Sequence, residues 1–408
     1  MDKIIASSFN LLDQRTTVDR AAGTHTLYRT AHVIFNSVRQ PQFSWEHHNT
    51  PSGPPNMLLP TAPITIAASL TNGTTVYPIT FNNGGPNATI APGGEVYCDP
   101  INVTLNQGET WYCQTVVTAD TGVLWYVHRT ANVPYFGTNE YYVSGSSTVL
   151  GSLTSPTYAG TTFQGLSLYR PSKLIGRPVR SDATAYLMIG DSNMAGSADS
   201  WGGDNISLGF TNNILDAAGV ASLNRAIPGD TCLNFLEFNQ LRTRGAEYCT
   251  DILLALGTND TSLAGFSTPA RYIAVLENLQ ALGKPITCLT VPPRSVTLNS
   301  GVQTPDANVY ARRQMINNFI VSKGHPAIET VWDVSALISD PANPAIYRTI
   351  DSSGTLPVAG DMLHYTRVGV RWIVANGASF IESAKTKKNP SQRPAINYAL
   401  KERYGYNI

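Results

Sequence analysis

Two successive patterns along the chain predict an α/β fold from residue 184 to residue 385, preceded by a β-rich unit. From residue 184 onward, short apolar runs alternate with longer stretches of helical periodicity. Before that point, runs rich in Val, Ile, Thr and Tyr follow one another with turns between them. Alternation of strands and helices indicates a parallel sheet covered on both faces. A chain of 408 residues is long enough for both units.

The α/β unit, residues 184–385, contains five strand-like runs and four helical ones. The strands are expected at residues 186–189, 220–224, 251–256, 285–291 and 330–334, and the helices at 208–218, 269–282, 307–322 and 367–384. The wholly apolar run at 186–189 is typical of a strand buried on both faces. In an open sheet of this kind, the loops after the strands form the edge where ligands bind.

Residues 46–170 are expected to form an antiparallel sandwich that binds a glycan or docks to a larger assembly. Strand-like runs at 62–70, 75–81, 95–98, 110–119 and 122–128 are separated by turns rich in Gly, Asn and Pro. The unit also contains Trp111, Tyr112, Trp125, Tyr126, Tyr135, Phe136, Tyr141 and Tyr142. These rings could form a platform that stacks on sugars, although in a sandwich such residues more often fill the core.

Three further segments complete the expected organisation. Residues 1–45 have a mixed pattern, residues 171–183 are expected to be a linker, and residues 386–408 form a basic tail. The neighbouring His47 and His48 have no further ligand at a useful spacing, so we expect surface or packing residues rather than a metal site.

The five cysteines predict either free thiols or a single disulfide. Their odd number excludes a fully paired monomer. Cys98 and Cys113 lie in two runs that could pair as neighbouring strands, so one bridge between them is an open alternative to five free thiols. Their spacing does not resemble a zinc site, and we expect no metal.

Composition argues against several classes of partner. The net charge is zero, which gives no electrostatic basis for binding nucleic acid or an anionic membrane. Charged residues make up only 14%, and a surface rich in Asn, Thr, Ser and Gly suits an uncharged partner such as a glycan. Neither a membrane span nor an apolar leader is evident. We expect an intracellular protein, or one that leaves the cell by lysis or another route, or one whose leader was removed.

Ser192 is the candidate nucleophile. It follows the run at 186–189 and the turn Gly190-Asp191, and small residues that could open a helix come after it. A serine at this position lies at the carboxyl end of a strand and near a helix N-terminus, where a developing negative charge is favoured. The alternative is a turn serine that only caps the helix.

A serine nucleophile also needs a base and donors for the oxyanion. Gly229, after the second strand, allows a close approach of its backbone N–H, and Asn259, after the third, offers a neutral amide donor. Late in the chain, His364 can be the general base and Asp361 can orient it from three residues earlier. Each residue alone could equally be a turn or capping residue.

Four short blocks occur in order: Gly190-Asp-Ser192, Gly229 within Pro-Gly-Asp, Gly257-Thr-Asn-Asp260 and Asp361-Met-Leu-His364. Together they resemble the SGNH (GDSL-type) hydrolase family of esterases. The resemblance covers about residues 184–385. It implies a three-layer α/β/α sandwich with a five-stranded parallel sheet and no cofactor. It also implies a triad of Ser192, His364 and Asp361, with an oxyanion hole formed by the Ser192 N–H, the Gly229 N–H and the Asn259 side chain.

The first block points toward sugar esters. Gly190-Asp-Ser-Asn-Met194 is similar to the Gly-Gln-Ser-Asn-Met block of sialate O-acetylesterase-like carbohydrate esterases, except that Asp191 replaces Gln. We therefore expect an O-acetylesterase that acts on an acetylated glycan. The alternatives are a lipase or thioesterase on the same triad, or an adhesin-like module with a silent hydrolase unit. We also expect either a homo-oligomer or docking to a larger assembly such as a virion. A location outside the cell or on a virus particle is favoured slightly over a cytoplasmic one.

Overall fold

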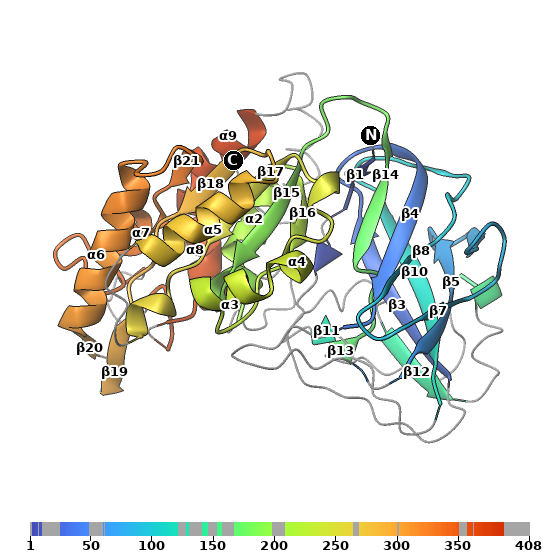
Figure 1. Cartoon of the computed structure of the whole chain (residues 1–408), viewed down its shortest axis with the longest axis horizontal. Helices are drawn as coiled ribbons and strands as arrows, with labels where there is room; N and C mark the ends of the chain where they lie inside the picture. The colour runs from blue at the N-terminus through green and yellow to red at the C-terminus, as the bar shows by residue number, and fades with distance from the viewer. Residues whose placement is uncertain are drawn as a thin grey trace.

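The computed structural model describes residues 2–6, 8–9, 25–48, 60, 62–120, 128–129, 141–145, 153–156, 167–197, 209–263, 269–299, 302–350, 357–361 and 363–386. They form two parts that lie side by side (Figure 1). A β-rich part comes mainly from the N-terminal half of the chain, and an α/β part comes from the C-terminal half.

The β-rich part consists mainly of antiparallel strands. Their bounds are β1 (Lys3–Ile4), β3 (His25–Val33), β4 (Val38–Glu46), β5 (Ile64–Thr71), β6 (Val76–Ile79), β7 (Ala88–Ile90), β8 (Glu95–Tyr97), β9 (Thr104–Leu105), β10 (Thr110–Thr118), β11 (His128–Arg129), β12 (Tyr141–Gly145), β13 (Ser167–Leu168) and β14 (Lys173–Pro178). One sheet has the order β1-β14-β4-β8, with β9 also on β4. The other has the order β12-β3-β10-β5-β6, with β7 also on β5. The strands β11 and β13 pair separately.

The two larger sheets enclose one apolar core. Phe43 and Trp45 of β4 are buried in it together with Ile66 and Leu70 of β5, which belongs to the other sheet. Facing sheets that bury alternate side chains between them form a sandwich, as predicted for this half of the chain.

The boundaries of the β-rich part differ from those predicted. Residues 1–45 supply β3 and most of β4, so this segment belongs to the sandwich. The expected linker at 171–183 contains β14, which pairs with β1 and β4. Prolines suggested a linker because they donate no ladder hydrogen bond. Pro171 precedes β14 and Pro178 is its last residue, so neither one interrupts the strand.

The α/β part is organised on a parallel sheet. Its strands are β2 (Ser8–Phe9), β15 (Ala185–Gly190), β16 (Ala221–Asn224), β17 (Asp251–Ala255), β18 (Ile286–Leu289) and β21 (Ile328–Trp332), in the order β2-β16-β15-β17-β18-β21. The five predicted strands are present and parallel. The unexpected sixth strand, β2, comes from near the N-terminus and pairs with β16.

Helices follow the strands. They are α1 (Ser192–Ala195), α2 (Phe210–Ala217), α3 (Cys232–Glu237), α4 (Asn239–Arg242), α5 (Ala270–Gln280), α6 (Ala307–Val321), α7 (Val334–Ile338), α8 (Arg367–Asn376) and α9 (Ala378–Thr386), with 3-10 turns η2 (Ala246–Tyr248) and η3 (Asp260–Ser262). A hairpin of β19 (Ser295–Asn299) and β20 (Val302–Pro305) precedes α6. The helix predicted at 367–384 is two helices that meet at Gly377.

Helices cover the sheet on both faces. Tyr186 and Met188 of β15 pack in a core with residues of α2, α8 and α9. The intervening Leu187 and Ile189 pack in a second core with residues of α3, α5 and α6. Successive side chains of a strand point to opposite faces, so the two cores lie on opposite sides. The three-layer α/β/α sandwich is therefore confirmed.

The cysteines and the histidine pair each follow one of the alternatives expected from the sequence. All five cysteines are buried and free. Cys98 follows β8 and Cys113 lies in β10, so they belong to different sheets rather than to neighbouring strands. His47 and His48 are buried packing residues. No helix in the described ranges has the length and apolar character needed to cross a bilayer.

Most of the predicted aromatic platform cannot be compared with the structure. Trp111 is buried in the core of the sandwich. Trp125, Tyr126, Tyr135 and Phe136 lie outside the described residues, as do the side chains of Tyr141 and Tyr142 and residues 387–408 of the basic tail.

Candidate active site

Ser192 is the first residue of α1 and follows the central strand β15 directly. The turn between them is tight. A Cβ at Gly190 would lie 2.7 Å from Met194 Sδ, so glycine is required there. Asp191 caps the helix by accepting a hydrogen bond of 3.0 Å from the Asn193 N–H. The cap and the glycine together hold Ser192 at the carboxyl edge of the sheet.

His364 links Ser192 to Asp361. His364 Nε2 lies 2.9 Å from Ser192 Oγ, and His364 Nδ1 lies 2.6 Å from Asp361 Oδ2. The carboxylate can only accept a hydrogen bond, so it selects the tautomer that carries the hydrogen on Nδ1. Nε2 then accepts the Ser192 hydroxyl. This is the arrangement that a serine nucleophile with a histidine base requires.

The two oxygens of Asp361 have separate contacts. Oδ1 accepts the backbone N–H groups of Leu363 and His364 at 3.0 and 2.6 Å, which holds the loop, while Oδ2 contacts the imidazole. Partial burial acts to raise the pKa of Asp361, but these hydrogen bonds and the His364 ring outweigh it and lower the pKa to about 2. Asp361 is therefore ionised at neutral pH.

Two tyrosines, Tyr347 and Tyr365, hold the loop that carries Asp361 and His364 in place. Tyr347 donates its hydroxyl to the Leu363 carbonyl at 3.1 Å. Tyr365 is buried, with its ring edge-on to those of Phe210 and Tyr347. The loop then enters α8 through a cap in which Thr366 accepts the Gly369 N–H.

Three hydrogen-bond donors follow neighbouring strands of the parallel sheet: the Ser192 N–H after β15, the Gly229 N–H after β16 and the Asn259 amide after β17. Among the described residues, the backbone N–H groups of Ser192 and Gly229 have no acceptor. Asn259 Nδ2 donates one hydrogen to the Asp230 carbonyl at 2.9 Å, next to Gly229. A primary amide nitrogen carries two hydrogens, so a second one remains for a ligand. The Gly229 φ of 78° is in the region that favours glycine.

Buried polar contacts anchor the Gly229 loop. The Ile227 N–H donates to the Gly190 carbonyl at 3.0 Å, which joins the loop to the end of β15. Asp230 pairs with Arg242 at 2.7 Å, and Asp260 accepts the Cys232 N–H at the start of α3. The loop is thus tied to β15, to α4 and to the Asn259 turn.

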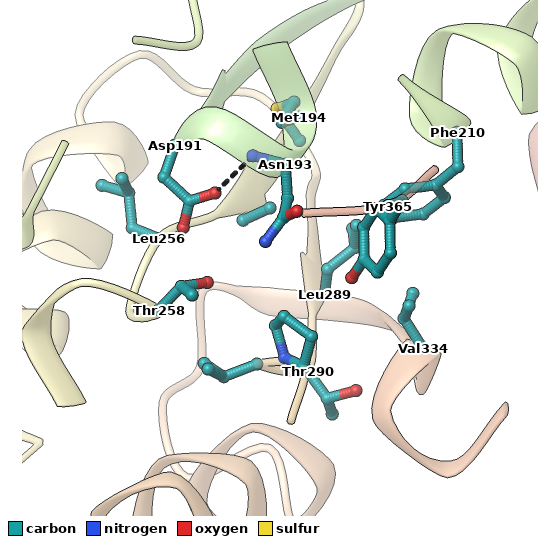
Figure 2. Close-up of a pocket in the computed structure, with 13 residues that line it drawn as sticks. Asp191, Asn193, Met194, Phe210, Leu256, Thr258, Leu289, Thr290, Val334 and Tyr365 are labelled. Atoms are coloured by element: carbon teal, nitrogen blue, oxygen red, sulfur yellow. Dashed lines mark hydrogen bonds between the residues drawn. The ribbon is translucent and has the colours of Figure 1, made fainter. Parts of the chain in front are cut away.

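A small cavity of about 20 Å³ lies beside α1, where the loops after β17 and β18 approach it (Figure 2). Its polar lining comes from Asp191, Asn193, Thr258 and Thr290. Within the described part of the chain, both polar side-chain atoms of Asn193 are buried without a hydrogen-bond partner. A volume of this size is that of about one water molecule.

Burial also changes the acidity of the capping carboxyl. Asp191 is 1% exposed, and burial raises its pKa to about 6, although the Thr258 hydroxyl and the Asn193 N–H oppose the shift. The Asp191 carboxyl, one residue before Ser192, therefore changes its protonation state at about pH 6.

The described ranges hold no group of three His, Cys, Asp or Glu residues arranged to bind a metal ion.

Comparison with known proteins gave matches to solved structures only; no protein-family model and no curated protein matched. A GDSL-like lipase from Bacteroides thetaiotaomicron is 15% identical with a TM-score of 0.35, and the match covers 51% of this chain and 91% of that one. A family two carbohydrate esterase from Clostridium thermocellum, solved in complex with cellohexaose, is 10% identical with a TM-score of 0.35, covering 95% and 100%. An acetylxylan esterase mutant from Geobacillus stearothermophilus is 12% identical with a TM-score of 0.34, covering 48% and 94%.

In this chain, five parallel strands lie in the order β16-β15-β17-β18-β21, and Ser192 directly follows β15. The α/β part therefore has the three-layer α/β/α architecture that the resemblance to SGNH hydrolases implies. Within it, the carboxyl edge of the sheet brings together Ser192, His364 and Asp361 through two hydrogen bonds. Asn259, from the loop after β17, donates to the carbonyl of Asp230, the residue after Gly229 in the loop after β16.

Sequence reasoning did not identify several residues that support the candidate site. Tyr347, Arg242 and Asn224 hold its loops through contacts with residues 12 to 30 positions away in the sequence. One signal was present for Asp191, because an Asp directly before a helix is a typical capping residue.

Proposed function

We propose that this protein is an SGNH-family serine esterase that removes O-acetyl groups from a carbohydrate. The observation that carries the proposal is the hydrogen-bonded chain from Asp361 through His364 to Ser192 at the carboxyl edge of the parallel sheet. The reaction needs no metal or organic cofactor, because the nucleophile, base and oxyanion donors all come from this chain.

In the first half-reaction, Ser192 Oγ attacks the carbonyl carbon of the acetyl ester while its proton passes to His364 Nε2. The carbonyl oxygen becomes an oxyanion, for which we assign the Ser192 N–H, the Gly229 N–H and the second Asn259 amide hydrogen as donors. The tetrahedral intermediate expels the sugar hydroxyl, which takes the proton from His364. Ser192 is left acetylated, and ionised Asp361 stabilises the imidazolium during the transfer.

In the second half-reaction, His364 removes a proton from a water molecule as the water attacks the acetyl group. The same donors stabilise the second oxyanion. Its collapse breaks the bond to Ser192, returns the proton from His364 to the serine and releases acetic acid, which ionises to acetate. The sequence of steps consumes one water and returns every catalytic group to its starting form.

The acetylated sugar is inferred from composition and from the first block. The chain has no net charge and is poor in charged residues, which suits an uncharged polymer. Asn193 and Met194 follow the nucleophile, as in the carbohydrate-esterase form of the block. We assign the β-rich part a role in holding the polymer or in docking to a larger assembly.

A series of 4-nitrophenyl esters with growing acyl chains tests the proposal, together with acetate release from acetylated polysaccharides. We expect the highest kcat/KM for acetate esters, release of acetate from at least one polymer, and loss of both activities with a serine-directed inhibitor. A preference for long acyl chains would favour a lipase, and a preference for thioesters a thioesterase. No turnover of any ester would favour the silent, adhesin-like module.

A further inference from the structure

A buried ion pair joins the β-rich part to the loop that carries Gly229. Glu46 is the last residue of β4, and Arg225 is the first residue after β16. Two hydrogen bonds link them, from Arg225 Nη1 to Glu46 Oε2 at 2.8 Å and from Nη2 to Oε1 at 2.6 Å. The side chains are 0% and 2% exposed for Arg225 and Glu46. Paired bonds of this kind fix the orientation of the guanidinium as well as its position.

Arg225 begins the segment that ends at Gly229. Its backbone N–H donates to the Met188 carbonyl at 2.8 Å, and Nη2 also donates to the Arg244 carbonyl at 3.1 Å. The rest of the segment is short, and Ile227 anchors it to the end of β15 as described above. Arg225 thus fixes the start of this segment, four residues before Gly229, and Ile227 fixes its middle.

Further charged and titratable groups surround Glu46. Lys173 Nζ lies 2.7 Å from Glu46 Oε1 and also contacts Glu95, and His48 Nε2 lies 3.3 Å from Glu46 Oε2. Burial acts to raise the pKa of Glu46, but Arg225 and Lys173 outweigh it and hold that pKa well below its usual range. Glu46 is therefore ionised, and its removal would leave Arg225 buried without its carboxylate, which is strongly unfavourable.

Apolar contacts bring the same two parts together. Ile4, Phe35 and Ile175 of the β-rich part are buried in the core that contains Leu187 and Ile189 of β15. The strand β2 adds to the edge of the parallel sheet beside β16. The ion pair is thus held within a continuous packed interface rather than at a hinge.

We propose that Glu46 is a positioning residue for catalysis, which holds the Gly229 N–H in the oxyanion hole through Arg225. This inference rests on the proposed function. The β-rich part then contributes to the rate of the chemical step in addition to any contact with the polymer.

Two variants with the same change of charge separate positioning from stability. Glu46→Gln removes the carboxylate that binds Arg225, whereas Glu95→Gln removes a carboxylate of the same cluster that contacts Lys173 instead. We expect Glu46→Gln to lower kcat on 4-nitrophenyl acetate roughly 10- to 100-fold with KM changed less than about threefold, the pattern of a lost transition-state contact. Affinity for a boronic acid inhibitor should fall by a similar factor. Glu95→Gln should keep kcat within about threefold of the wild-type value, even if it lowers Tm as much as Glu46→Gln does.

Hydrogen–deuterium exchange of residues 225–231 provides a readout that does not depend on activity. Exchange should rise in Glu46→Gln and stay at the wild-type level in Glu95→Gln. Arg225→Lys retains the charge but not the paired bonds. If Glu46→Gln does not fold, Arg225→Lys takes its place in the experiment and should show the same loss of kcat. Unchanged kcat in the folded variants, or equal losses in Glu46→Gln and Glu95→Gln, would overturn the proposal. A wild-type protein that hydrolyses no ester would instead overturn the proposed function, while exchange would still report on the anchoring of the loop.

Discussion

The Asn259 side chain divides its amide hydrogens between the fold and the candidate site. One is donated to the Asp230 carbonyl, and the other is available to an oxyanion. We expect Asn259→Ala to lower kcat roughly 10²- to 10³-fold with a smaller effect on KM, because the donor acts mainly in the transition state. Ser262→Ala is the matched control, since Ser262 only donates to the Asn259 carbonyl from the same turn. A change confined to KM would make Asn259 a substrate-binding residue.

Asp361 combines a structural and a chemical contact that one substitution can separate. Asn at this position retains an acceptor at Oδ1 for the Leu363 and His364 N–H groups, but it replaces the carboxylate oxygen that selects the Nδ1–H tautomer. We expect Asp361→Asn to fold and to lose on the order of 10³- to 10⁴-fold in kcat. Steady-state kinetics with circular dichroism as the folding control measures this. A loss smaller than about tenfold would limit Asp361 to holding the loop.

At the scale of elements, the cap of α1 predicts a pH-dependent stability. Burial raises the pKa of Asp191 to about 6, whereas an unfolded Asp titrates near ~3.9. Between these values the folded protein retains a proton that the unfolded chain has released, so the free energy of unfolding from this group falls as pH rises. The full effect is about 3 kcal/mol for a shift of two pKa units.

Asp191→Asn tests that effect because the amide oxygen can still cap Asn193 but does not titrate. Denaturant unfolding of wild type and variant should be compared between pH 4 and pH 7. The variant should gain stability relative to the wild type as pH rises, by up to about 3 kcal/mol. A difference that stays constant over this range would show that Asp191 does not titrate there.

The elements of the α/β part were largely predictable from local pattern. Runs such as 186–189 are apolar throughout, and glycines mark their ends. The parallel sheet then places residues that follow different strands at one edge, which is why Ser192 and Asn259 could be assigned to the same site. The edge strand β2 has only two residues and no such signal.

The supporting contacts were not predictable, because they join segments far apart in sequence. Glu46 and Arg225 are 179 residues apart, and each is an ordinary charged residue in its local context. The strand β14 was hidden by the prolines at its borders, which suggested a linker. Long-range burial, rather than local propensity, determines the role of such residues.

For the whole molecule, the two parts depend on each other. Removal of residues 1–170 would expose the apolar side chains that pack with Ile4 and Phe35 in one core. It would also remove β2 from the parallel sheet and leave Arg225 without Glu46. A fragment of residues 180–385 would keep every residue of the candidate triad and oxyanion hole but lack these contacts. The packed interface now predicts that this fragment does not fold stably. Circular dichroism and thermal unfolding of the fragment check this, and a cooperative transition close to that of the full chain would contradict it.

The most direct test of the central claim is to locate the adduct formed with a fluorophosphonate, which reacts with activated serine hydroxyls. The full-length protein should be labelled and digested, and the modified peptide identified by mass spectrometry. We expect one adduct per chain on Ser192, loss of ester hydrolysis in proportion to labelling, and little labelling of folded His364→Ala. An adduct on a different serine, or full hydrolytic activity after Ser192 is blocked, would contradict the proposed mechanism.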